Sequence, residues 1–173
     1  MDNGKGYPMF ALKPLHANAI QSALQKAERY RFLNEPGEAE SICLDVLQVD
    51  PNNQQARIAL LLALTDQFAD DGHAYDRARG VLSQISGDYE RAYYGGMVAE
   101  RRAKAQASRR TGASVGVYEW IVDAMESFQR AEKLRPEGND DAVLRWNACV
   151  RFLERNPHLR PASEERTEIE MLE

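Results

Sequence analysis

The sequence predicts an all-α fold of about seven helices, and three observations support this prediction. Most apolar residues recur at spacings of three and four, which place them on one face of a helix. No stretch alternates apolar and polar residues with the period of two that is typical of a half-buried strand. One pattern of small and larger apolar residues closing on a proline occurs twice, at 39–51 and 124–136, with identical spacing.

The first three helices are expected at residues 17–33, 37–49 and 54–68. The apolar stripe of the first helix contains Ile20, Ala23, Leu24, Ala27 and Tyr30, and that of the second contains Ala39, Ile42, Cys43, Val46, Leu47 and Val49. The third helix differs, because the run 58–64 is apolar without a polar break, so all its faces would be apolar. Seven such residues are far too few to cross a bilayer.

The other four helices are expected at residues 75–86, 89–108, 116–134 and 140–155. The stripes that define three of them contain Tyr75, Ala78, Leu82 and Ile85; then Trp120, Ile121, Ala124, Met125, Phe128 and Ala131; then Ala142, Val143, Trp146, Cys149, Val150 and Leu153. A glycine pair, Gly95 and Gly96, interrupts the helix at 89–108 and would cost it about 2 kcal/mol relative to alanines. Such a pair allows the close approach of a neighbouring helix or of a partner segment.

The length of 173 residues is typical of one domain, which would bury about 70% of its unfolded surface. The net charge of −5 does not favour general attraction to nucleic acid or to anionic lipid. The chain has two cysteines, Cys43 and Cys149, which both fall on apolar helix faces. We therefore expect both to be small core residues rather than a disulfide or a metal pair.

Tails are expected at both ends of one helical domain that spans residues 17–156. Residues 1–16 have no long apolar core, so no signal peptide is expected and the protein is placed in the cytoplasm. Residues 157–173 form an acidic tail that contains the helix-breaking residues Pro157 and Pro161. This tail is expected to be disordered.

Small alanines and prolines recur in the repeated pattern. The two copies are Ala39, Cys43, Val46 and Pro51, and Ala124, Phe128, Ala131 and Pro136; a weaker copy without a proline is Ala78, Leu82 and Ile85. Alanine lets paired helices approach closely, and proline stops the second helix of each pair. The pattern resembles the tetratricopeptide repeat (TPR), a helix-turn-helix unit of about 34 residues.

The resemblance implies an α-solenoid of antiparallel helix pairs, with about three degenerate repeats at 20–53, 54–91 and 92–138 and a capping helix at 139–156. The second unit carries about five extra residues near 68–76, and the third about thirteen near 105–117. In a stacked array an inner helix is covered by neighbours on several sides. This explains the apolar helix at 54–68 as core.

Motifs that are typical of catalytic, metal-binding or phosphate-binding sites are scarce in the sequence. His16, His73 and His158 are far apart, and no pair has helical metal-ligand spacing with a carboxylate. The glycine-containing stretches at 95–97 and 111–116 lack the pattern of a phosphate-binding loop. We therefore expect no catalytic residues, no metal and no cofactor, so the protein is not expected to be an enzyme.

TPR arrays bind extended peptides or partner domains in a groove lined by the first helix of each unit. The resemblance places ten residues there: Leu24, Glu28, Arg31, Gln55, Ile58, Leu62, Thr65, Tyr93, Gly96 and Glu100. The alternative is that the polar ones are simply solvated and the apolar ones are core. The subclass that grips chaperone C-termini is disfavoured, because Leu24 and Glu28 occupy the places of its lysine and asparagine.

A basic stretch stands out in this acidic protein. It contains Arg101, Arg102, Lys104, Arg109 and Arg110 and no acidic residue. Three interpretations are open: a solvated extension of the helix, a patch for an acidic partner surface, or a contact with nucleic acid, which is not expected.

These features together predict a non-catalytic protein–protein interaction module, either an adaptor or an accessory or assembly subunit. Its partner would be another protein, with an acidic surface as one alternative, bound by the groove and by the extra residues of the third unit; no membrane contact is expected. The alternative is a small TPR chaperone that keeps an apolar client soluble, similar to the class II chaperones of type III secretion.

Overall fold

A computed structural model describes residues 10–108 and 114–161 of the chain. Within these residues the structure consists of seven α-helices and two short 3-10 helices, and it contains no strand. The α-helices are α1 (Ile20–Phe32), α2 (Pro36–Val49), α3 (Gln54–Asp66), α4 (Ala74–Leu82), α5 (Asp88–Ser108), α6 (Ser114–Leu134) and α7 (Asp141–Arg155). The prediction of an all-α fold is confirmed.

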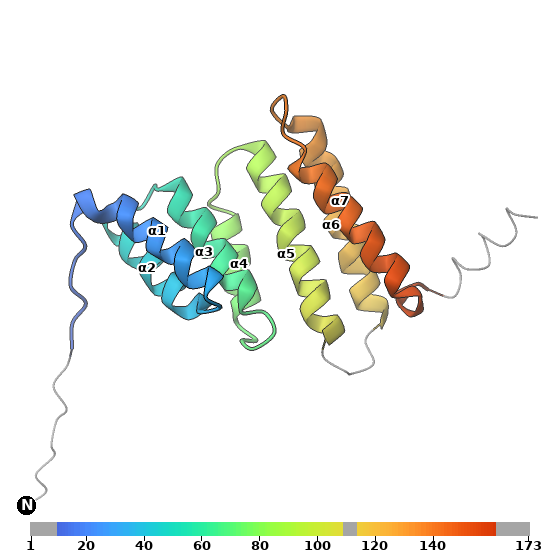
Figure 1. Ribbon diagram of the computed structural model, residues 1–173, viewed down its shortest axis with the longest axis horizontal. Coiled ribbons are helices and arrows are strands. Elements are labelled where there is room, and N and C mark those ends of the chain that lie inside the picture. Colours follow the sequence, from blue (N-terminus) through green and yellow to red (C-terminus); the bar gives the residue numbers. More distant parts are fainter. Residues whose placement is uncertain (1–9, 109–113, 162–173) are drawn as a thin grey trace, which may run out of the picture.

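The helices follow one another in space in the order of the chain, from α1 and α2 at one end to α6 and α7 at the other (Figure 1). Each helix packs on the next one, and the turns between them are short, so successive helices run in opposite directions. In addition, α1 contacts α3, and α3 contacts α5. This pattern of neighbours is that of stacked helix pairs.

Local sequence signals set the helix ends. Asn34 adopts a left-handed backbone with φ of 60° between α1 and α2, and α2 then starts on Pro36. Asn53 caps α3, because its side-chain oxygen accepts a hydrogen bond from the backbone N–H of Ala56 at 2.8 Å. Gly87, with φ of 89°, turns the chain into α5.

Helix α3 is buried on several sides, as its uninterrupted apolar run predicts. Its buried residues are Ala56, Ala59, Leu60, Leu61, Ala63, Leu64 and Thr65. Helices α1, α2, α4 and α5 all contact it. The apolar helix is therefore core. None of the described helices is both long enough and apolar enough to span a membrane.

Helix α5 takes part in both of the large apolar clusters. The first cluster contains residues of α1, α2, α3 and α4 together with Val98 of α5. The second contains residues of α5, α6 and α7 and surrounds Phe128. A smaller third cluster surrounds Leu24 and Val46 at the α1 end. Residues on opposite sides of α5 thus belong to different cores.

Several boundaries differ from those predicted. Helix α4 ends at Leu82, earlier than expected, although Ile85 in the following turn is still buried. The packed region also continues past residue 156, because Leu159 in the second 3-10 helix (Pro157–Leu159) is buried against the α6–α7 cluster. The rest of the expected acidic tail, 162–173, and the first nine residues of the expected N-terminal tail lie outside the described residues.

The glycine pair in α5 has different surroundings at each position. A Cβ atom added at Gly96 would lie 2.6 Å from Cε1 of Phe128, a fully buried ring. A Cβ atom added at Gly95 would lie 3.7 Å from Leu82, which is an ordinary contact. Gly96 therefore allows α5 and α6 to approach closely, whereas Gly95 does not serve this purpose.

We expect Gly96→Ala to lower the free energy of unfolding by about 1–3 kcal/mol, because the new methyl group overlaps Phe128 and forces a shift in the core. Gly95→Ala is the matched control and should raise it by about 0.5–1 kcal/mol, since alanine favours the helix. Urea denaturation of both variants measures the difference. Equal effects at the two positions would contradict the assigned role of Gly96.

Candidate functional site

A shallow hollow of about 70 Å³ lies between α1 and α3. The residues that line it are Leu24, Glu28, Arg31, Gln55, Ile58, Ala59 and Leu62. All of them except Ala59 were predicted from the sequence to line a groove, so the structure brings six of the ten predicted residues together. Apolar side chains from both helices meet polar side chains at its rim, and we call this hollow the α1–α3 groove.

Three other predicted groove residues are buried inside the protein. Thr65 is 4% exposed, Glu100 is 0% exposed, and Gly96 lies under Phe128. The physical reason is that α6 and α7 cover the face of α5 that carries Gly96 and Glu100. These three residues therefore cannot line an open groove.

Tyr93, the tenth predicted residue, is half-buried and takes part in an aromatic cluster. Its ring stacks on Tyr89 with the ring centroids 5.8 Å apart, and it lies 6.0 Å from Phe128. Tyr89 also accepts a hydrogen bond at 3.0 Å from the side-chain amide of Asn139, just before α7. This cluster supports the end of the molecule formed by α5, α6 and α7.

The buried carboxylate of Glu100 is neutralised by two basic side chains. Lys104, one turn further along α5, pairs with one oxygen, and Arg145 of α7 lies 3.4 Å from the other. Burial lowers the pKa of Arg145, but Glu100 and Tyr93 raise it by more, so it lies above its usual value. Arg145 thus joins α7 to α5, whereas Lys104, predicted as part of a basic surface, pairs within α5 and lies 5.8 Å from the ring centroid of Phe152 of α7.

A second charge network connects the first helix of each pair. Asp66, at the end of α3, accepts a hydrogen bond from Nε of Arg31 at 2.7 Å and pairs through its other oxygen with Arg101 of α5. Arg101 also donates to the hydroxyl of Thr65 at 2.7 Å. One carboxylate therefore joins α1, α3 and α5.

We expect Asp66→Asn to lower the free energy of unfolding by about 1–3 kcal/mol, because two partly buried guanidinium groups lose their counter-ion. Asp123→Asn is the control, since Asp123 is exposed on α6, and should change it by less than about 0.5 kcal/mol. Urea denaturation measures both. If the two variants were equally stable, Asp66 would not hold these helices together.

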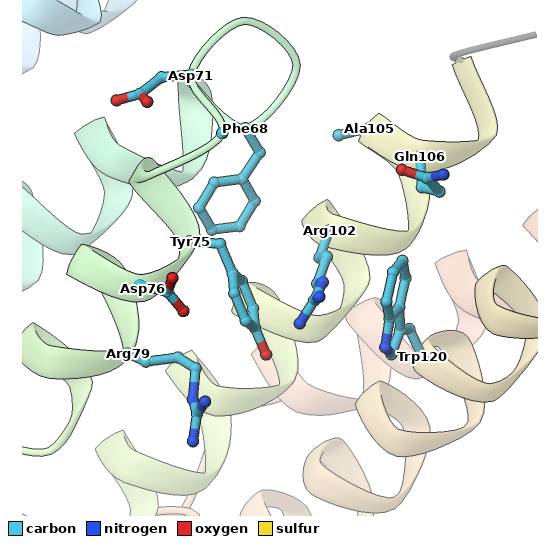
Figure 2. A pocket seen from close by; sticks show the side chains of 10 residues that line it. Phe68, Asp71, Tyr75, Asp76, Arg79, Arg102, Ala105, Gln106 and Trp120 are labelled. Carbon is cyan, nitrogen blue, oxygen red and sulfur yellow. The ribbon is translucent and has the colours of Figure 1, made fainter.

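Arg102, the neighbour of Arg101, points in a different direction from α5, into a cleft between α4 and α6 (Figure 2). Its guanidinium carbon lies 3.6 Å from the ring centroid of Tyr75 and 4.1 Å from that of Trp120. The cleft has a volume of about 370 Å³. Its lining residues are Phe68, Asp71, Gly72, Tyr75, Asp76, Arg79, Arg102, Ala105, Gln106 and Trp120, and we call it the α4–α6 cleft.

The basic stretch predicted from the sequence is thus divided among several places. Arg101, Arg102 and Lys104 contact three different parts of the protein, and the other two residues, Arg109 and Arg110, lie outside the described residues. The described part does not form one continuous basic patch. Its helix continues to Ser108, and α6 starts at Ser114, so most of the extra residues of the third unit lengthen these two helices.

The loop between α3 and α4 forms one wall of the α4–α6 cleft. Asp71 accepts a hydrogen bond from the backbone N–H of His73 at 2.8 Å and pairs with Arg77 at 2.6 Å. These contacts, the backbone bond first, hold the pKa of Asp71 below its usual value. Arg77 also pairs with Glu40 of α2. The extra residues near 68–76 are therefore fixed by specific contacts.

The α4–α6 cleft was not predicted as a site from the sequence. Tyr75 and Trp120 were recognised only as core positions of their helices, and Phe68 was not singled out. The available signal was three aromatic residues beside the two departures from the regular repeat length. Their meeting depends on how α4 and α6 are placed about α5, which no spacing within one helix reveals.

Both cysteines are buried and unpaired, as predicted. Burial raises the pKa of Cys43 to about 11 and that of Cys149 to about 12, with a further contribution from Glu100 in the second case. At neutral pH both groups are therefore thiols rather than reactive thiolates. Across residues 10–108 and 114–161, no three His, Cys, Asp or Glu side chains gather as metal ligands would.

We expect a thiol-specific reagent such as DTNB to leave the folded protein unlabelled at pH 8 and to label both cysteines in denaturant, because access requires unfolding. Absorbance of the released product measures the reaction. Ser41→Cys introduces a thiol at an exposed position of α2 and should react at once. Rapid labelling of the unmodified folded protein would contradict the burial of these thiols.

Comparisons with protein-family models, with curated proteins and with solved structures find no match to this chain.

Proposed function

We propose that this protein is a non-catalytic module that binds another protein in the cytoplasm, as an adaptor or an accessory subunit, through a TPR-like array of helix pairs. The observation that carries the proposal is the α1–α3 groove. It is formed by the first helices of two successive pairs, which is where the resemblance to TPR proteins places a binding groove.

The chemistry of the groove suits a protein segment. Ile58 and Leu62 supply apolar surface at the bottom, above the buried Leu24, while Glu28 and Gln55 are exposed at the rim. An apolar centre with a polar rim is the usual arrangement of a protein-binding surface. The hollow has room for a single small side chain rather than for a whole small-molecule ligand. An extended segment inserting one apolar side chain therefore fits best.

The groove is also held in a fixed shape. Arg31 at its rim is paired with Asp66, and Leu24 beneath it is almost fully buried against α2 and α3. Because these side chains are already ordered, binding would cost less conformational entropy than at a mobile surface.

Photo-crosslinking tests this proposal directly. With a photoreactive amino acid at position 55, in the groove, the protein should capture a partner from cells that produce it, and the same group at 129 should not. Gln129 is an exposed residue of α6, away from the groove. Glu28→Lys, introduced into the protein that carries the photoreactive group at 55, should weaken capture about tenfold, because it reverses the charge at the rim. Mass spectrometry identifies the captured protein.

Gln129→Lys is the control for added charge and should leave capture unchanged. A folded partner recovered in a defined ratio supports an adaptor. A mixture of apolar unfolded chains would instead support the chaperone alternative. Capture that is equal from positions 55 and 129 would overturn the assignment of the groove.

A further inference from the structure

The guanidinium group of Arg102 is held between two aromatic rings. Tyr75 of α4 lies on one side of it and Trp120 of α6 on the other (Figure 2), at 3.6 and 4.1 Å from the guanidinium carbon. Both faces of the planar group are covered by these cation–π contacts. Its N–H bonds lie in the plane of the group, so they are directed along the cleft, between the rings.

These N–H donors have no acceptor in the part of the chain that the structure describes. Arg101, the preceding residue, donates to two oxygen atoms, whereas the contacts of Arg102 are only with rings. Gln106 lies one turn further along α5 and lines the same cleft, so its amide adds another donor on this wall. A rigid guanidinium with free in-plane donors is prepared for a bidentate contact with a carboxylate.

The facing wall restricts how much negative charge the cleft accepts. Asp71 and Asp76 line it from the loop and from α4, and the pairing of Asp71 with Arg77 keeps that carboxylate ionised. Arg79 adds one positive charge on the same wall. The lining therefore carries two acidic and two basic side chains, and because Asp71 is already paired with Arg77 outside the lining, the remaining charges of Asp76, Arg79 and Arg102 sum to +1. A group with a single negative charge fits this balance, whereas a phosphate dianion or a run of acidic residues meets repulsion.

We propose that the α4–α6 cleft binds one carboxylate side chain of a partner protein segment, with Arg102 donating two parallel hydrogen bonds to it. This inference rests on the proposed function and adds a second contact site, separated from the α1–α3 groove by the body of α3 and α5. Phe68, which also lines the cleft, gives the rest of the segment apolar surface beside the anchored carboxylate.

The test uses the full chain and two blocked pentapeptides, one with a single central glutamate flanked by glycine and serine, and one with glutamine in its place. The indole N–H signal of Trp120 reports binding by NMR. It is assigned with Trp146→Phe, since the chain has two tryptophans. The glutamate peptide should shift this signal in a saturable way, and the glutamine peptide should not.

Arg102→Met keeps the side-chain length and the packing between the rings but removes the donors. It should weaken binding of the glutamate peptide about 10- to 100-fold, the loss expected for a charge-assisted bidentate contact. Arg102→Lys should give an intermediate loss, because an ammonium keeps the charge but lacks the fork. Arg151→Met removes an exposed charge on α7, outside the cleft lining, and should leave binding unchanged.

A solely structural role for Arg102 predicts a different result. In that case Arg102→Met and Arg102→Lys would change the melting temperature, measured by circular dichroism. The glutamate peptide would not bind the unmodified protein. Equal shifts with both peptides, or undiminished binding by Arg102→Met, would overturn the inference. Neither outcome contradicts the proposed function, because that function is tested separately by crosslinking in the α1–α3 groove. If crosslinking in the groove failed while the glutamate peptide still bound, the assignment of the α1–α3 groove would be contradicted and that of the α4–α6 cleft would stand.

Discussion

Three consecutive residues of α5 hold the rest of the structure together. Successive side chains on a helix are about 100° apart, so Glu100, Arg101 and Arg102 point in three directions. The first contacts Arg145 of α7, the second contacts the end of α3, and the third lies between α4 and α6. Helix α5 is thus the common support of both apolar cores. Arg101, Arg102 and Lys104 have partners within the array, which accounts for the described part of the basic stretch in a protein with a net charge of −5.

The helices could be predicted from the sequence because their signals are local. The apolar stripes and the helix-ending Pro51 and Pro136 depend on neighbours within a few positions, and so does the uninterrupted apolar run of α3. The α1–α3 part of the groove was predictable for a related reason, since residues at the same positions of successive units meet when the units stack. The burial of Gly96 and Glu100 was not predictable in this way, because Gly96 is covered by Phe128 of α6 and Glu100 pairs with Arg145 of α7, which is 45 residues further along the chain.

The two candidate surfaces differ in what makes them specific. The α1–α3 groove offers apolar surface with a charged rim and has room for one small side chain. The α4–α6 cleft is larger and is organised around the guanidinium group of Arg102. A partner that used both would need an apolar residue and an acidic residue at a fixed separation. Two modest contacts joined in this way can discriminate between partners more sharply than either one alone.

The order of packing along the chain also bears on how the protein is made. Nearly every helix contacts only the next helix or the one after it, so each contact closes a short stretch of chain. During synthesis, the cluster formed by α1 to α4 can be buried as soon as α5 has emerged, before α6 and α7 exist. Helix α5 then exposes the face that carries Gly96 until Phe128 arrives. The growing chain therefore exposes only one apolar helix face at a time that still lacks its covering helix.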